Sequence, residues 1–282
     1  ISEPFEGLFT QGMVCHETYK DPENNWVSPE EIETIEGKKY LKKNHSKKIT
    51  IGPSESMSKS KKNTIDPENI IKSYGADAAR LFILSDSPPE KDVQWSEEGI
   101  ISSYKFIQKL WNLNSKIINK MNENHDDDYD EELKKETNKF LKKITENLEK
   151  FSYNKIIANM HEMHSFLTKE INNTYSKKDL FENYKKILIA ITPIIPHFTS
   201  ECLEMMQINE IKWIEYDETK IKEDIIKIVI QINGKKRGLI ETTKDIDENS
   251  VIELIRRDET IKKYFSNQEI KRTIFVKNKL LN

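Results

Sequence analysis

The sequence predicts an α+β protein with several domains, in which an α-helical bundle precedes a small C-terminal α+β domain. Apolar residues recur every three or four positions from Ser96 to Ile191, the spacing of amphipathic helices that pack together. Near Ile225 this spacing changes to two, which is typical of a strand with one buried face. With 282 residues and 36% hydrophobic content, the chain is long enough to form a separate core in each domain.

The charge and the cysteines limit the classes of function. Basic residues number 45 and acidic residues 48, so the net charge of −3 indicates no global affinity for a polyanion. Any nucleic-acid contact must therefore come from a local basic patch. Cys15 and Cys202 lie far apart, without the CxxC spacing of a zinc ribbon or a redox pair, which favours a reducing, cytoplasmic compartment.

Signals for membrane insertion and export are missing from the sequence. No apolar run approaches the roughly 18 residues of a membrane-spanning helix, which argues against a membrane protein. The first residues lack a charged region followed by an apolar one, so no signal peptide is predicted. The chain begins at Ile1 within what reads as a continuing segment, and we expect it to be a fragment of a longer protein.

The N-terminal third predicts a strand, a polar excursion and two short helices. A strand is predicted over residues 8–14, an apolar stretch that contains Gly12. Residues 15–48 are polar and broken by proline and glycine, which predicts an inserted surface segment with a small hairpin. The sequence Asp66-Pro67-Glu68 predicts a helix start, Gly75 predicts its end, and a second helix is expected from residue 76 to about 84.

Four to five amphipathic helices are predicted to form the bundle. The acidic run 126–132 is predicted to be a solvated linker between the first two. The predicted core-facing positions are Ile100, Tyr104, Ile107, Trp111, Asn114, Ile118 and Met121; then Leu133, Thr137, Phe140, Ile144, Leu148 and Phe151; then Ile157, Met160, His164, Leu167 and Ile171; and finally Leu180, Tyr184, Ile187 and Ile191.

A β-hairpin is predicted at the start of the C-terminal domain. Isoleucines alternate with other residues from Ile226 to Ile232, and Asn233-Gly234 then supplies the two residues of a type I′ turn. The returning strand begins with the basic residues Lys235, Lys236 and Arg237, which would lie at the hairpin tip. A helix from about 250 to 264 and a strand from 271 to 276 are expected to complete the domain.

One motif points to chemistry. The stretch Gly52–Asn63 contains Met57-Ser58-Lys59-Ser60 and leads into the Asp66-Pro67 helix start. It resembles the KMSKS signature of class I aminoacyl-tRNA synthetases, a loop that closes over ATP. An ammonium group on such a loop can stabilise the charge that develops on departing pyrophosphate.

The resemblance implies roles for individual residues of this loop. Lys59 would be the catalytic lysine, and Met57, Ser58, Lys59 and Ser60 would bind ATP. Ser56 stands where the family usually has its first lysine, which leaves Lys61 or Lys62 as a partial substitute. The alternative is a basic surface loop on an ordinary domain, and the Asp66-Pro67 start and the following Tyr74–Arg80 segment argue against it.

Finer features resemble the leucyl branch of this family. After the signature the chain reads Lys61-Lys62-Asn63, where the isoleucyl, valyl and methionyl enzymes usually read Leu-Gly-Asn. Two alternatives remain at this point, another class I synthetase for isoleucine, valine or methionine, and a non-catalytic tRNA-binding module derived from a synthetase. The other stretches that look leucyl are Gln11–Val14, Ser85–Pro89 with Trp95, and Val229–Arg237.

The resemblance also implies the domain plan and the partners. The plan is the end of a Rossmann-like catalytic domain (1–14), the inserted polar segment (15–48), the signature-loop region (49–95), a helical anticodon-binding domain (96–222) and a C-terminal tRNA-binding domain (223–282). ATP, Mg²⁺, leucine and tRNA-Leu are the implied cofactors and partners of a cytoplasmic, monomeric ligase of protein biosynthesis. The family's upstream His-Ile-Gly-His signature does not occur in these residues, so this segment alone is expected to be inactive.

Three further groups of residues have a structural as well as a functional interpretation. Lys235, Lys236 and Arg237 would meet tRNA phosphates without burying charge, the alternative being a turn that serves only solubility. Asp77 and Arg80 stand at helical spacing and are predicted to pair structurally. His161 and His164 do not have the four-residue spacing of a metalloprotease helix, so no metal site is predicted there.

Overall fold

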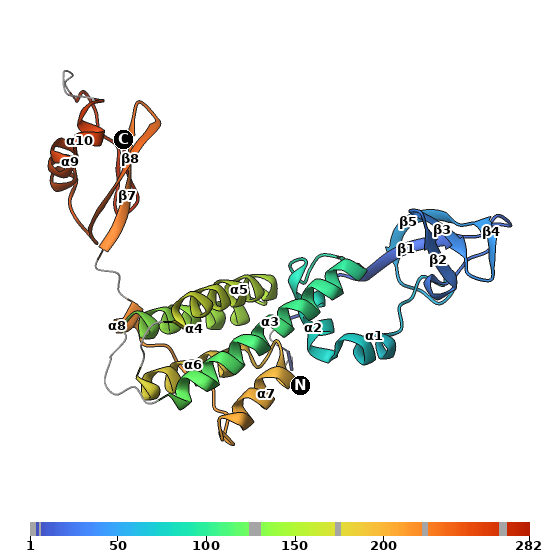
Figure 1. Ribbon diagram of the computed structural model, residues 1–282. Coiled ribbons are helices and arrows are strands. Elements are labelled where there is room, and N and C mark those ends of the chain that lie inside the picture. Colours follow the sequence, from blue (N-terminus) through green and yellow to red (C-terminus); the bar gives the residue numbers. More distant parts are fainter. Residues whose placement is uncertain (1–3, 6, 124–130, 173–175, 222–224, 265–269) are drawn as a thin grey trace. The chain divides into compact units, whose positions relative to one another are not determined.

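The computed structural model describes residues 4–5, 7–123, 131–172, 176–221, 225–264 and 270–282. These residues form two compact units, Ile1–Asp217 and Glu218–Asn282, each of which is described by itself. Most of the acidic run at 126–132 lies outside the described residues, and its last two residues begin a helix. Figure 1 shows the order of the elements along the chain.

The signature motif comes directly after β5, an edge strand of a three-stranded sheet with the order β5-β1-β6. Strand β1 (Val14–Lys20) pairs antiparallel with β5 (Thr50–Ser56) and parallel with the short β6 (Val93–Gln94). The predicted strand over residues 8–14 is wrong except for its last residue. Leu8 is 90% exposed, and Cys15 is the first buried residue among those described, so the strand forms later than the apolar run indicated.

Gly12 nevertheless lies where the backbone needs a glycine. Its amide donates to Pro89 O at 2.8 Å, and a Cβ at this position would stand 2.1 Å from Lys91 O. The backbone of another segment therefore approaches Gly12 closely, and only a residue without a side chain fits there.

The polar segment between β1 and β5 forms a small β module. It contains the 3₁₀ turn η1 (Pro29–Glu31) and the antiparallel strands β2 (Ile32–Ile35), β3 (Lys38–Leu41) and β4 (Asn44–Lys48). The predicted hairpin is confirmed, because the two residues between β2 and β3 both have positive φ, 50° and 75°, as a type I′ turn requires.

Two short helices follow the signature motif as predicted. Asp66 accepts a hydrogen bond from the Glu68 amide and caps α1 (Pro67–Tyr74), and Gly75 separates it from α2 (Ala76–Ser85). Asp77 and Arg80 have the expected structural role, but they do not pair with each other, because both side chains bind another segment. The Asp77 carboxylate accepts the amides of His197 and Phe198, and the Arg80 guanidinium donates to the carbonyls of Pro193 and Ile194, a few residues earlier.

Five helices form the predicted bundle within the described part of the first unit (Figure 1). They are α3 (Glu97–Asn122), α4 (Glu131–Glu149), α5 (Tyr153–Glu170), α6 (Lys177–Ile191) and α7 (Pro196–Met205). They share one core with the buried Leu81 of α2. Most predicted core positions of α4, α5 and α6 are buried.

The predicted stripe on α3 is displaced from the true one. Trp111 is 39% exposed and touches Phe198 edge-on, with ring centroids 6.0 Å apart. Helix α3 packs against several neighbouring helices, so its buried face is wide, and Trp111 lies at its margin. Phe151, 45% exposed, was also wrongly assigned to the core, because α4 ends two residues before it. The buried positions of α3 are Ile100, Ser103, Phe106, Leu110, Leu113, Asn114, Ile117 and Met121.

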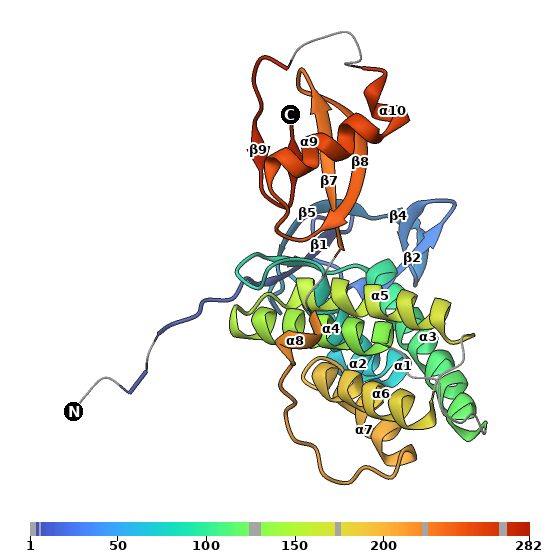
Figure 2. The ribbon, with the colours of Figure 1, turned by 90° about the vertical axis from the view of Figure 1, so that its left-hand side faces the viewer.

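The second unit begins with α8 (Glu218–Ile221) and contains the predicted hairpin, β7 (Ile225–Ile232) and β8 (Lys235–Thr243). Asn233 and Gly234 have φ of 54° and 73°, which confirms the type I′ turn. Helix α9 (Glu248–Arg257) covers one face of the sheet (Figure 2), where Val251 and Ile255 pack on the isoleucines of the hairpin.

The end of this unit differs from the prediction. The expected single helix is interrupted at Asp258, whose carboxylate accepts two amides and begins the short α10 (Glu259–Lys262). The expected strand over 271–276 is reduced to β9 (Phe275–Val276). The missed strand β10 (Leu280–Leu281) inserts between β9 and β7, which gives the sheet order β8-β7-β10-β9.

Candidate functional site

The signature residues form a tight turn that leaves the sheet at the end of β5. The Met57 amide donates to Val14 O at 3.1 Å, so the chain is still tied to β1 at the point where the turn begins. The turn spans Lys59 to Lys62 and is closed by the Lys62 amide, which donates to Lys59 O at 3.3 Å. Lys62 has a φ of 53°, the left-handed conformation that lets the chain reverse.

Lys59 lies at the exposed end of this turn. Lys59 and Ser60 are exposed, whereas Met57 and Ser58 are half-buried. Within the described part of the chain, no ion pair involves the Lys59 ammonium group. The Ser58 and Ser60 hydroxyl oxygens lie 3.3 Å apart, beside that lysine. A solvated cation next to two hydroxyl groups can bind an anion without first breaking an internal ion pair.

The other two lysines of the loop differ in how they are held. Lys61 is half-buried and forms an ion pair with Glu55 of β5, so its ammonium is directed back toward the sheet. Lys62 is exposed. Ser56, in the place of the family's usual first lysine, is also exposed and lies beside Cys15. Of the two candidates to replace that missing cation, Lys62 is therefore the more accessible.

Sequence reasoning missed the residue that anchors the loop, Asn63. Its side chain is 0% exposed and bonds three backbone atoms, accepting from the Ser58 amide at 2.8 Å and donating to His16 O at 3.2 Å and Glu55 O at 3.1 Å. The His16 imidazole returns a hydrogen bond from Nδ1 to Asn63 O, at 3.3 Å. Burial lowers the pKa of His16, which favours the neutral ring in this contact. The only sequence signal was a polar residue immediately after a charged turn.

The predicted basic tip lies on the hairpin of the second unit. Lys235, Lys236 and Arg237 are all exposed, and no ion pair holds them among the described residues. Arg237 is the extra residue of a β-bulge, and its guanidinium lies 4.6 Å from the centre of the Tyr264 ring. The stacking orders one cation, while the two lysines remain solvated.

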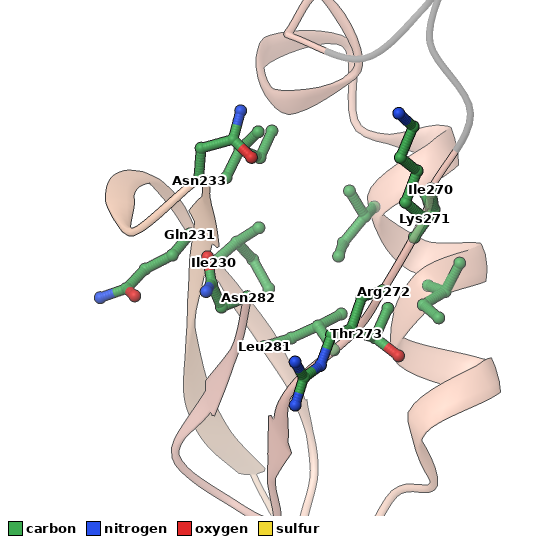
Figure 3. Close-up of a pocket in the computed structure, with 12 residues that line it drawn as sticks. Ile230, Gln231, Asn233, Ile270, Lys271, Arg272, Thr273, Leu281 and Asn282 are labelled. Atoms are coloured by element: carbon green, nitrogen blue, oxygen red, sulfur yellow. The ribbon is translucent and has the colours of Figure 1, made fainter.

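A pocket of about 640 Å³ opens beside the same hairpin (Figure 3). Ile230, Ile255 and Leu281 are among its apolar lining residues. Lys271 and Arg272 supply cationic groups from the segment that faces the strands. This pocket was not predictable from the sequence, because part of its lining comes from the short strand β10.

The histidines of α5 and the cysteine of α7 are packed against other side chains or buried. The His161 ring stacks on Phe106 with centroids 3.7 Å apart, and burial lowers the pKa of both His161 and His164. Burial raises the pKa of the Cys202 thiol to about 12, so it stays protonated at neutral pH. No group of three or more potential metal ligands occurs among the residues that the structure describes.

None of the described helices is both long and apolar enough to span a bilayer.

Two family models match the regions that these features occupy. Residues 49–96, which include the signature turn, match the model of class I tRNA synthetases for isoleucine, leucine, methionine and valine. Residues 130–253, from the bundle into the hairpin unit, match the model of the anticodon-binding domain of tRNA ligases. Over its whole length the chain is 42% identical to a leucine–tRNA ligase of Orientia tsutsugamushi.

The chain belongs to the leucine–tRNA ligase family. Leucine–tRNA ligases of Zymomonas mobilis and Bartonella quintana are 36% and 38% identical to it, again along the whole chain. The chain spans about a third of these relatives, 34% of the Orientia and Bartonella proteins and 33% of the Zymomonas protein. The similarity favours the leucyl branch over the other class I synthetases that the sequence left open.

A solved structure shares the fold. It is the ternary complex of an Agrobacterium radiobacter leucyl-tRNA synthetase with tRNA and the ligand LeuAMS. The match has a TM-score of 0.69 at 20% identity and covers 80% of this chain and 30% of that one. Together with the two family models, this match confirms the expected architecture, the end of a class I catalytic domain joined to a helical anticodon-binding domain.

Proposed function

We propose that this chain is the part of a leucine–tRNA ligase that closes a cationic loop on ATP and holds tRNA-Leu. The whole enzyme would activate leucine with ATP and transfer it to tRNA-Leu in the cytoplasm, as a monomer. The observation that carries the proposal is the identity of 42% along the entire chain, which includes a signature turn with an exposed lysine.

In this proposal Lys59 is the catalytic residue of the loop, and Met57, Ser58 and Ser60 complete its ATP contacts. When the leucine carboxylate attacks the α-phosphate, negative charge grows on the departing pyrophosphate. A lysine that approaches only when the loop closes stabilises the transition state more than the bound substrates. The exposed position of Lys59 and its freedom from ion pairs with described residues support this assignment.

The proposal includes both ATP and Mg²⁺, which would be held by different groups. The residues that fit ATP phosphates are the loop cation and its hydroxyl neighbours. Mg²⁺ prefers phosphate oxygens and water, and ATP phosphates would therefore hold it here. Its chemistry would be to neutralise phosphate charge.

The remaining regions would bind tRNA. We propose the anticodon-binding role for the helical domain at 96–222 and tRNA binding for 223–282, while 1–14 and 49–95 complete the catalytic domain around the insert at 15–48. The anticodon-binding model that matches residues 130–253 supports this assignment. The solved relative with tRNA bound supports it in the same way.

Amino-acid-dependent exchange of pyrophosphate into ATP tests the proposed substrate. The full-length enzyme that contains this chain is expected to exchange pyrophosphate with leucine and to charge tRNA-Leu. Assays with isoleucine, valine and methionine are the matched comparisons, since related synthetases use them. Preferential exchange with any of these three would sink the leucyl assignment. No exchange with any amino acid would favour a tRNA-binding module.

The hairpin tip makes a second prediction. Changing Lys235, Lys236 and Arg237 together to alanine is expected to weaken tRNA binding and to flatten its dependence on salt. The logarithmic slope should fall by up to about one per lost phosphate contact. Binding would be measured over a series of salt concentrations. The control is Lys227→Ala on the same hairpin, because Glu241 already neutralises that lysine at 2.9 Å. An unchanged slope in the triple variant would show that the tip is only solvated.

A further inference from the structure

Asn63 stands out because it is a fully buried polar residue on a loop whose other residues, 57–62, are exposed or half-buried. Its side-chain oxygen accepts one backbone amide and its side-chain nitrogen donates to two backbone carbonyls. A buried amide that satisfies its groups in this way contributes to a unique conformation, since each partner left alone would carry a desolvation cost.

The three partners of Asn63 come from the three segments that define the loop. Glu55 belongs to β5, where the loop begins, and His16 belongs to the neighbouring β1. Ser58 is the residue before Lys59, and its amide lies 2.8 Å from the Asn63 oxygen. The side chain therefore closes the turn from Ser58 to Asn63 and ties the closed turn to the sheet beneath it.

No other residue type makes all three bonds in this place. Alanine leaves three backbone groups without their partner, and aspartate keeps the acceptor but turns an anion toward two carbonyl oxygens. Glutamine adds a methylene to a side chain that is already 0% exposed. The three backbone partners thus need both the donor and the acceptor of an asparagine.

We propose that Asn63 is the positioning residue of the signature loop and sets where the Lys59 ammonium group emerges. This inference rests on the proposed function of Lys59 in ATP activation. Asn63 is buried below the turn and would not touch ATP, so it acts through Lys59. A lysine displaced by even about 1 Å loses much of its transition-state contact, because charge stabilisation depends on a preorganised geometry.

A double-mutant cycle in the full-length enzyme tests this dependence. Asn63→Ala is expected to lower kcat for leucine-dependent pyrophosphate exchange about 10-fold, with the KM for leucine unchanged. In a Lys59→Ala background the same change should cost less than about twofold, because no positioned cation is left to lose. A purely structural role would not lower kcat while leaving KM unchanged. Nor would it make the effect of Asn63→Ala depend on the presence of Lys59.

The outcomes separate this inference from the proposed function. If the two changes multiply in the double variant, Asn63 acts independently of Lys59 and the inference is overturned. If Lys59→Ala keeps the parental rate, the proposed catalytic role of Lys59 is overturned as well. The control is Asn114→Ala, which removes another fully buried asparagine, bonded to the Tyr184 hydroxyl in the bundle. Asn114→Ala should lower stability but leave kcat unchanged in both the parent and the Lys59→Ala background.

A proteolysis readout keeps the test decisive if Asn63→Ala reduces folding. Asn63→Asp keeps the volume of the side chain and is carried through the same cycle. Trypsin cleavage after Lys59, Lys61 and Lys62, followed by mass spectrometry, measures how firmly the turn is held. Cleavage at these lysines should be faster in the Asn63 variants than in the parent and in Asn114→Ala. Unchanged cleavage at all three would show that Asn63 does not anchor the turn.

Discussion

Replacing Lys59 with alanine in the full-length enzyme is expected to slow leucyl-adenylate formation by about 10²- to 10³-fold, the usual effect of losing one preorganised charge stabiliser. Binding of leucine should be nearly unchanged, because the ammonium would meet the triphosphate mainly in the closed loop. Single-turnover formation of the adenylate measures the rate, and equilibrium titration measures leucine affinity.

The neighbouring residues refine this expectation. Ser56 removes a cation that the family usually supplies, so Lys59 carries more of the stabilisation, and Ser56→Lys should leave the rate equal or raise it. Lys61 is engaged with Glu55, which leaves the exposed Lys62 as the nearest substitute. Lys43→Ala, an exposed lysine in the β module, controls for the loss of one positive charge.

The variants of the three loop lysines distinguish two ways in which this can fail. If Lys59→Ala activates leucine at the parental rate while Lys61→Ala or Lys62→Ala does not, another lysine of the loop has the catalytic role. If all three variants keep the parental rate, the loop has no catalytic role, although membership of the family would stand.

Local features were predictable from the sequence, because their cause lies within a few residues. Asp66-Pro67 starts α1, and Asn233-Gly234 makes the hairpin turn through two positive φ values. In both cases the determining interaction is made by the chain with itself over one turn. The signature loop was recognised differently, by the resemblance of residues 57–60 to a family motif.

The missed features depend on partners that are distant in the sequence. Asn63 binds His16, 47 residues away, and one side of that contact is a backbone atom that every residue possesses. Strand β10 has only two residues, and its position comes from pairing with β7 and β9. The shifted face of α3 reflects the number of helices around it. None of these causes leaves a periodic or compositional signal.

Asp77 provides a test of such a distant contact, and its loss should have a large effect on stability. The carboxylate is buried, with 6% exposure, and accepts the Phe198 amide at 2.6 Å and the His197 amide at 3.3 Å. These amides begin α7, whose N-cap residue, Ile195, makes no side-chain cap. An anion from α2 thus satisfies the free amides and the positive end of the helix dipole.

Asp77→Ala is expected to lower the free energy of unfolding by about 2 to 4 kcal/mol, since it leaves the buried Phe198 amide and the partly buried His197 amide without an acceptor and removes a charged bond. Asp77→Asn should cost less, because the amide oxygen still accepts one of them. Asp66→Ala is the matched control, an exposed helix cap whose loss should cost about 1 kcal/mol. Denaturant unfolding measures all three variants. Hydrogen exchange at the amides of His197 and Phe198 should accelerate in Asp77→Ala and not in the control. If Asp77→Ala costs no more than Asp66→Ala, the contact between α2 and α7 does not hold the two helices together.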